Sequence, residues 1–264
     1  MIERTFGLIG RPFLQFYNSC ESFGHFILFQ FSLFKRLPTL FRRKRLLFIQ
    51  IETIGFGSLG VVFLTALFTG MVEAVQLYDG FHKYGVENFM GYTIFVSITK
   101  ELGPVFATLM VISRSISAMS AELGTMRVSE QIDAMDILGV DSKSYLLIPR
   151  IVATVISLPI LVIWFDVVAI SSAYLIAVNV LGVNAQAYTD TLMQLGTMSD
   201  ITTGLLKALV FGLIISSIGS YMGYHAKGGA RGVGNATIYG VVYSAIAIFI
   251  GNYFLSAFFL VLGL

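Results

Sequence analysis

The sequence predicts an all-α membrane protein with an N-terminal interfacial amphipathic helix, five transmembrane helices and an amphipathic cytoplasmic helix between the second and third spans. Two observations carry this fold class. Hydrophobic residues make up 56% of the 264 residues and charged residues only 12%, about half the charged share of a soluble domain. The apolar residues are also grouped into stretches long enough to cross the roughly 30 Å hydrocarbon core of a bilayer as helices.

Residues 1–45 are expected to form a region that lies on the membrane instead of crossing it. In the segment Pro12–Phe34, aromatic and apolar residues share one helical face and polar residues occupy the other. Its unbroken apolar part, 26–34, is too short to span a bilayer. A basic cluster follows directly, and an aromatic amphipathic helix beside such a cluster is typical of the cytoplasmic interface. A true span is the alternative.

Five apolar stretches are expected to form a transmembrane domain over residues 46–264. The predicted spans are 46–77, 89–112, 146–180, 201–221 and 234–264. The first and third exceed the length that a bilayer requires, so each must tilt, bend or begin in the interface. The glycines Gly55, Gly57 and Gly60 are the expected bend points in the first span. The loop over 182–200 has room for one short helix.

Basic residues are distributed unevenly between the two sides of this topology. Eight precede Leu46 and six more fall in loops on the same side, whereas the opposite side has Lys83 and nothing basic between Val180 and Asp200. By the positive-inside rule, the N-terminus is cytoplasmic and the C-terminus is exported.

A polar segment, 121–150, interrupts the apolar sequence on the cytoplasmic side. Within it, 121–139 is predicted to form one amphipathic helix, because apolar residues recur at helical spacing from Val128 to Leu138 while acidic residues share another face. A simple turn would need only a few residues, so we expect another protein to bind this helix. The candidate contact residues are Glu122, Arg127, Glu130, Asp133 and Asp136.

Charged residues also occur inside the predicted spans, where each costs about 2.5–3.5 kcal/mol to insert. Lys100 and Glu101 lie near the middle of the second span, Lys207 in the fourth, Asp166 in the third and Glu73 near the outer end of the first. Neighbours on a helix point about 100° apart, so Lys100 and Glu101 cannot satisfy one another well. Lys207 is the expected partner of Glu101. Two interpretations stay open: ion pairs that hold helices together, or groups that face a cavity.

Several kinds of chemistry lack support in the sequence. There is no phosphate-binding loop of the Walker type, so the chain is not expected to hydrolyse ATP by that route. The three histidines are isolated from one another, so no zinc site is expected. Cys20 is the only cysteine, which excludes an internal disulfide and a cysteine-based metal cluster. No catalytic residue is predicted.

Spaced blocks in the middle of the chain resemble the signature of MlaE/YrbE-type permeases, the membrane subunits of lipid transporters that work with MCE proteins. The blocks are Glu101–Pro104, Arg114, Ala121–Gly124, Glu130–Ala134, Tyr145–Leu146 and Pro149–Arg150, with Gly70–Val72 and Gln76 in the first span. Two positions depart from the family pattern. The run at 112–117 reads Ile-Ser-Arg-Ser-Ile-Ser instead of a glycine-containing run, and a proline common near Asp141 is missing.

The resemblance implies a permease subunit of an ATP-driven phospholipid transporter in the bacterial inner membrane, working as a homodimer. The implied partners are a cytoplasmic ABC ATPase, a periplasmic MCE-domain protein and, in some members, a small STAS-domain protein. ATP and Mg²⁺ would be used by the ATPase, no cofactor would be bound by this chain, and no nucleic acid is expected. The segment 121–139 would then be a cytoplasmic coupling helix.

Two other functions remain as alternatives. An intramembrane lipid-modifying enzyme would need a nucleophile or metal constellation that the sequence does not offer. A secondary transporter would usually show two related halves, and no internal repeat is visible.

For a phospholipid, the sequence offers a candidate path with a few polar groups among apolar walls. The candidates are Met71, Glu73, Leu77, Phe81 and Tyr84 at the outer end of the first span, with Lys100, Glu101 and Lys207 in neighbouring spans. We expect them to face a cavity at the dimer axis, open toward the exported side, with at least one lysine near a headgroup.

Overall fold

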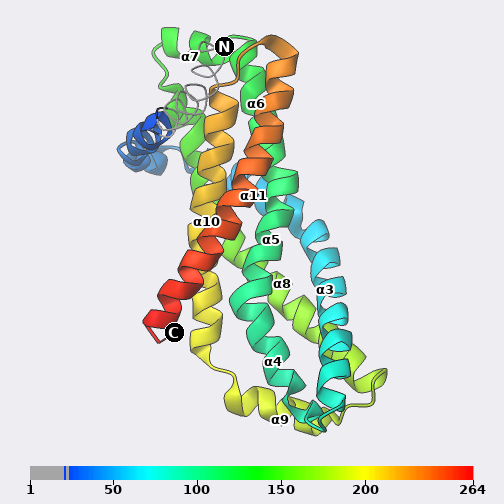
Figure 1. Cartoon of the computed structure of the whole chain (residues 1–264). Helices are drawn as coiled ribbons and strands as arrows, with labels where there is room; N and C mark the ends of the chain where they lie inside the picture. The colour runs from blue at the N-terminus through cyan, green and yellow to red at the C-terminus, as the bar shows by residue number, and fades with distance from the viewer. Residues whose placement is uncertain (1–20, 22–23, 264) are drawn as a thin grey trace, which may run out of the picture.

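The computed structural model describes residues 21 and 24–263, and over this part the chain is helical without strands. Five of the described helices are long and apolar enough to cross a membrane: Lys44–His82, Glu87–Val128, Lys143–Asn179, Met198–Tyr224 and Gly229–Val261. A shorter apolar helix, Gly24–Phe34, precedes them. The predicted fold class is therefore confirmed, and the protein is a multi-pass membrane protein (Figure 1). Cys20 and the first part of the segment 12–34 lie outside the described residues.

The first span is divided by a wide turn. Helix α2 (Lys44–Ile51) passes through the π turn η2 (Glu52–Phe56) into α3 (Gly57–His82). The π turn falls in the glycine-rich stretch where a bend was expected, and such turns are a recognised cause of helix distortion.

The second span continues much farther than predicted. It begins with η3 (Glu87–Phe89) and is interrupted by two π turns. Its further elements are α4 (Met90–Ser97), η4 (Ile98–Leu102), α5 (Gly103–Val111), η5 (Ile112–Ile116) and α6 (Ser117–Val128). The helix continues past the expected end of the span at residue 112, because α6 packs between α10 (Met198–Tyr224) and α11 (Gly229–Val261). Burial of Met119 and Leu123 against these helices stabilises a stretch that is not itself apolar enough to span.

The predicted single helix over 121–139 is also wrong. Helix α6 ends at Val128, and a separate short helix, α7 (Gln131–Ile137), follows. Between them Glu130 adopts a left-handed backbone with φ of 59°, which ends the first helix and turns the chain. Periodicity could not reveal this break, since the residues on either side keep helical spacing.

The rest of the chain forms the other half of the bundle. The third span joins η6 (Lys143–Leu147) to α8 (Ile148–Asn179), which packs against both α3 and α10. The loop that follows holds one short helix, α9 (Ala185–Leu195), capped by the side chain of Asn184. A capping box of Thr197 and Asp200 then starts α10. In Figure 1, α7 and α9 lie at opposite ends of the bundle.

Candidate functional site

The second span carries a defect in its hydrogen bonding that a lysine of another helix repairs. Pro104 has no N–H, so the carbonyl oxygen of Lys100, four residues earlier, lacks its usual helical donor. Lys207 reaches across from α10, and its Nζ donates to that oxygen at 2.8 Å. An orphaned backbone carbonyl in a membrane is costly, so this bond stabilises the π turn where Lys100 and Glu101 lie.

Lys207 is buried and fully bonded. Its side chain is 1% exposed. Besides the Lys100 carbonyl, its Nζ contacts Glu101 Oε1 at 2.7 Å and Ser256 Oγ at 2.8 Å. An ammonium has three N–H donors, and all three have partners here. The predicted pairing of Lys207 with Glu101 is confirmed, but this lysine has no donor left for a ligand.

Glu101 is held by α11 as well. Its Oε2 accepts a bond from Asn252 Nδ2 at 2.8 Å, and Ser256 Oγ lies 2.9 Å from its Oε1. Sequence reasoning missed Asn252 and Ser256. The available signal was their spacing of four residues, which places two polar side chains on one face of an otherwise apolar span.

Lys100 is in a different situation from Lys207. Its Nζ lies 2.9 Å from Asp200 Oδ1 at the start of α10, and its side chain is 26% exposed. Asp200 also accepts bonds from the backbone and hydroxyl of Thr197, so the capping box holds it in place. Lys100 therefore presents a fixed, partly exposed ammonium.

A cavity of about 480 Å³ lies beside the two lysines, between the second span, α10 and the end of α11. Its lining residues are Lys100, Glu101, Thr203, Lys207, Tyr253, Ser256, Ala257, Phe259 and Leu260. The volume falls in the range of small-molecule sites, roughly 300–1,000 Å³. Gly204 lets α10 approach closely enough to form it, because a Cβ there would overlap the carbonyl oxygen of Thr99.

The predicted path residues of the first span do not line this cavity. Glu73 accepts a hydrogen bond from Ser97 at 2.9 Å, about one turn before Lys100. Leu77 and Phe81 are partly buried against the core, Met71 is half-buried, and Tyr84 lies beyond the end of α3 with 83% of its surface exposed. Within one chain the structure therefore brings together Lys100, Glu101 and Lys207, but not the residues of α3.

Asp166 lies in α8 of the third span and faces the second span. It is 8% exposed, and its Oδ1 has no hydrogen-bond partner among the described residues. Gly103 faces it, since a Cβ at that glycine would overlap the carboxyl oxygen. A buried polar group without a hydrogen-bond partner is costly, so this position is a weak point in the packing of the two spans.

The acidic residues of the cytoplasmic segment mostly stabilise its own corner. Arg127 Nη1 pairs with Asp133 Oδ1 at 2.6 Å, across the left-handed turn at Glu130. Asp136 Oδ1 accepts the backbone N–H of Ser142 at 3.1 Å. A third acid, Glu122, pairs with the buried Arg150 at 2.8 Å. Glu130 itself is exposed, with no ion pair in the part of the chain described.

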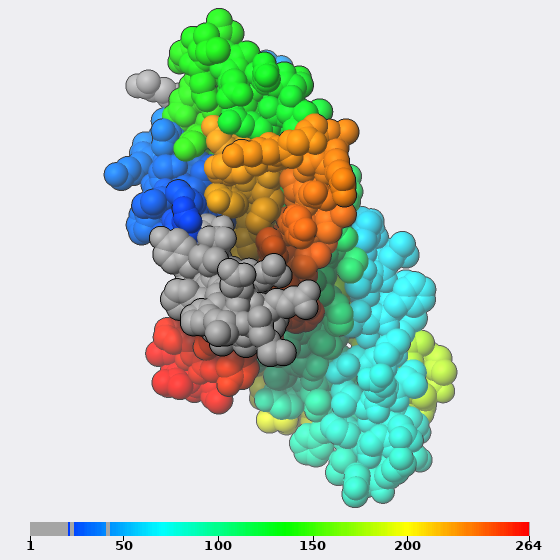
Figure 2. Space-filling view, turned by 45° about the horizontal axis from the view of Figure 1, so that its top comes forward, coloured from blue at the N-terminus to red at the C-terminus, as the bar shows by residue number. Residues whose placement is uncertain are grey.

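The tip of this segment is unexpectedly apolar. Ile137 and Leu138 are 85% and 80% exposed, and Leu138 belongs to the apolar series that predicted an amphipathic helix. Ile132 of that series is fully buried. Ile132 lies at the start of α7 and Leu138 caps its end, so the two residues of one apolar series have opposite environments on the same short helix. Figure 2 shows the green segment projecting past the orange start of α11.

The same segment is tied to the N-terminal helix. Arg36 Nε pairs with Asp141 Oδ2 at 2.8 Å, and Lys143 Nζ lies 5.3 Å from the ring centre of Phe29. Burial acts to raise the pKa of Asp141, but hydrogen bonds from Ser144 and Arg36 outweigh it, so the pKa lies below its ordinary value. The ends of two segments far apart in sequence are thus held together.

A family model for the permease MlaE matches residues 47–258. The chain belongs to the MlaE permease family. It is 40% identical over 258 residues to a probable ABC transporter permease protein of Rickettsia typhi, covering 97% of this chain and 98% of the relative. A probable ABC transporter permease protein of Synechocystis is 38% identical over 207 residues, covering 78% and 79%.

A third relative is the intermembrane phospholipid transport system permease protein MlaE of Haemophilus influenzae. It is 30% identical over 258 residues, covering 97% of this chain and 98% of the relative. The resemblance found in the sequence is therefore confirmed. The protein is a membrane permease subunit, and its ABC permease relatives favour this role over a lipid-modifying enzyme or a secondary transporter.

Proposed function

We propose that this permease moves phospholipid between the bacterial inner membrane and the outer envelope. It would act as a homodimer with a cytoplasmic ABC ATPase, which uses ATP and Mg²⁺, and with a periplasmic MCE-domain protein. A small STAS-domain protein is a further expected partner. The relative from Haemophilus influenzae is named for intermembrane phospholipid transport, which supports the substrate class.

The observation that carries the proposal is the cavity beside Lys100. A phospholipid has an anionic phosphate and apolar tails, so its site needs a cationic group set in apolar walls. Lys100 offers a partly exposed ammonium whose ion-pair partner is Asp200. Tyr253, Phe259 and Leu260 supply apolar wall in the same cavity.

The two lysines would then have different roles. Lys207 has no free donor and would keep the π turn in shape. Lys100 would bind the phosphate, since its ammonium retains donors after pairing with Asp200. The expectation of one lysine near the headgroup therefore becomes specific to Lys100.

The cytoplasmic tip is the proposed contact for the ATPase. Ile137 and Leu138 form an exposed apolar pair, and Glu130 adds an unpaired charge beside it. Apolar anchors surrounded by polar residues are typical of helix-in-groove contacts. With this tip on the cytoplasmic side, the N-terminus is cytoplasmic and the end of α11 faces the exported side.

Copurification from native membrane tests the assembly. The chain, purified with a mild detergent, should bring an ABC ATPase and an MCE-domain protein, and lipid mass spectrometry should find phospholipid in the complex. The complex in vesicles should move labelled phospholipid to an acceptor only with ATP and Mg²⁺. ATP-independent movement, or a purified complex without an ATPase, would contradict the proposal.

A further inference from the structure

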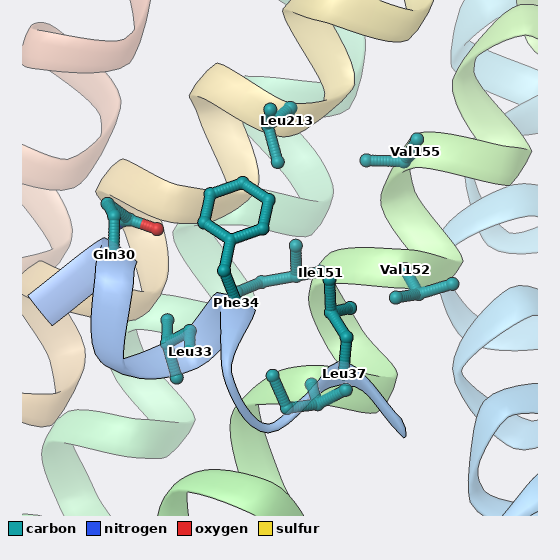
Figure 3. A pocket seen from close by; sticks show the side chains of 9 residues that line it. Gln30, Leu33, Phe34, Leu37, Ile151, Val152, Val155 and Leu213 are labelled. Carbon is teal, nitrogen blue, oxygen red and sulfur yellow. The ribbon is translucent and has the colours of Figure 1, made fainter. Parts of the chain in front are cut away.

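A second cavity lies beneath the N-terminal helix. It has a volume of about 180 Å³ and is lined by Gln30, Leu33, Phe34, Leu37, Ile148, Ile151, Val152, Val155 and Leu213. Figure 3 shows Phe34 from the N-terminal helix pointing toward Leu213 of α10, with Ile151, Val152 and Val155 of α8 beside them. Among the described residues of this lining, Gln30 is the one with a polar side chain.

This cavity is separate from the one beside Lys100. The two share no lining residue. Both touch α10, but Leu213 comes six residues after Lys207, which places it about 9 Å farther along the helix and roughly 120° around it. A ligand here would not occupy the proposed transport site.

The walls of the cavity are held in place by contacts outside it. The rings of Phe26 and Phe29 each lie 5.3 Å from Tyr221 in edge-on packing against α10. At the other end of the N-terminal helix, Arg36 is paired with Asp141. These contacts hold the N-terminal helix on either side of the cavity. The cavity beneath it is therefore present without a bound ligand.

The lining and the surroundings identify the occupant. An engineered protein cavity of about 150 Å³ with similar apolar lining stays dry and binds small hydrocarbons. Phe34 at this cavity is 49% exposed and ends a short apolar helix that precedes the first span, so acyl chains would be within its reach in a membrane. Lys35 follows it directly and is exposed, and the basic cluster continues to Arg45. These cations would attract an anionic headgroup.

We propose that this cavity binds one acyl chain of an anionic phospholipid from the leaflet next to the basic cluster, with the lipid phosphate beside Lys35. The bound lipid would fill the space under the N-terminal helix and hold that helix at a fixed depth. The proposal depends on the chain spanning a membrane but not on its transport activity.

Photolabelling in vesicles tests the site. The full chain is reconstituted in phosphatidylethanolamine and phosphatidylglycerol, with a trace of phosphatidylglycerol that carries a diazirine in its tail. After irradiation, adducts should concentrate on the peptides covering 30–37 and 148–155. The filling variant Val155→Phe should lower them about tenfold, because its ring occupies the ligand's space. The matched control Ile156→Phe, at an exposed neighbour, should leave them unchanged.

The headgroup is tested in the same assay. A phosphatidylcholine with the same tail probe should label the site several-fold less, and Lys35→Gln should weaken phosphatidylglycerol labelling. If Val155→Phe does not fold, Leu213→Phe fills the cavity from the opposite wall. Adducts spread over all exposed apolar positions, no change in the filling variants, or equal labelling by both lipids would each overturn the proposal.

Discussion

Lys207 donates a hydrogen bond to the backbone oxygen of Lys100, 2.8 Å away, where Pro104 cannot supply one. The motif Glu101–Pro104 and the lysine of α10 therefore form one structural unit. Pro104 leaves the carbonyl oxygen of Lys100 without its helical donor. The ammonium of Lys207 bonds to that oxygen and also pairs with Glu101. The cavity beside Lys100 depends on this repair, since the π turn forms one of its walls.

Replacing Lys207 should destabilise the protein more than replacing both members of its pair. Lys207→Met leaves the Lys100 carbonyl without its donor, at a cost of about 1–3 kcal/mol for an unsatisfied buried group. It also removes the ion pair of Glu101, which keeps its bonds from Asn252 and Ser256. The double variant Lys207→Met with Glu101→Gln should recover part of that loss. Thermal unfolding in detergent measures both. Equal loss in the single and double variants would show that the two residues are not coupled.

Lys100→Gln should weaken phospholipid binding while leaving the fold intact. Its loss removes one charged hydrogen bond to the phosphate, which corresponds to roughly tenfold in affinity. The measurement is phospholipid retained by the purified protein, together with ATP-driven transfer. Lys83→Gln is the matched control, because Lys83 forms an exposed ion pair with Asp79 away from the cavity. The same loss in both variants would point to a general charge effect.

The pair Arg36–Asp141 should transmit movement of the cytoplasmic segment to the N-terminal helix. Arg36→Glu and Asp141→Arg should each reduce the coupling of ATP hydrolysis to transport, and the two together should restore it by re-forming the pair. Measuring transport per ATP hydrolysed in all three variants gives the answer. A double variant worse than either single one would rule out a direct role for the pair.

This pair also predicts a pH dependence. The pKa of Asp141 is lowered in the folded protein from its ordinary value near 3.8. Its contribution to stability is therefore fully present above that ordinary value and is lost as the pH falls through the lower folded pKa. Acid titration of wild type and Asp141→Asn, followed by thermal unfolding, should show curves that converge below about pH 4. Curves that stay parallel throughout would exclude this linkage.

Polar substitution at the cytoplasmic tip should release the ATPase without unfolding the permease. Leu138→Asp changes a side chain that is 80% exposed. Substitutions at exposed positions usually change the free energy of unfolding by no more than about 0.5 kcal/mol, and we expect the same here. Glu130→Lys should weaken the same contact by reversing an unpaired charge. Copurified ATPase is the quantity to measure. Glu52→Lys, an exposed acid in the first span, serves as the control.

The structure gives Asp133 a role within this chain, whereas the sequence suggested a contact with another protein. Its carboxylate is already bound to Arg127 across the corner between α6 and α7. Reversal of this residue would disturb the corner itself, so a loss of ATPase would not identify a direct contact. Glu130 and Leu138 are the cleaner probes.

The sequence alone determined the features that depend on composition and local chemistry. Five apolar stretches gave five spans, because hydrocarbon accepts only helices of sufficient length with their backbone bonds satisfied. The pairing of Lys207 with Glu101 was also predictable, since a charge in a membrane needs a partner on another helix. The loop after the third span was long enough for one short helix, and α9 lies there.

Only the tertiary structure decided which groups meet. It broke the helix at Glu130, exposed Leu138, brought Asn252 and Ser256 to Glu101, and left the path residues of α3 outside the cavity. The physical reason is that helical periodicity fixes the face of a side chain only while the helix stays regular. One left-handed residue or π turn redirects every side chain beyond it, and packing between distant helices decides where such breaks are stable.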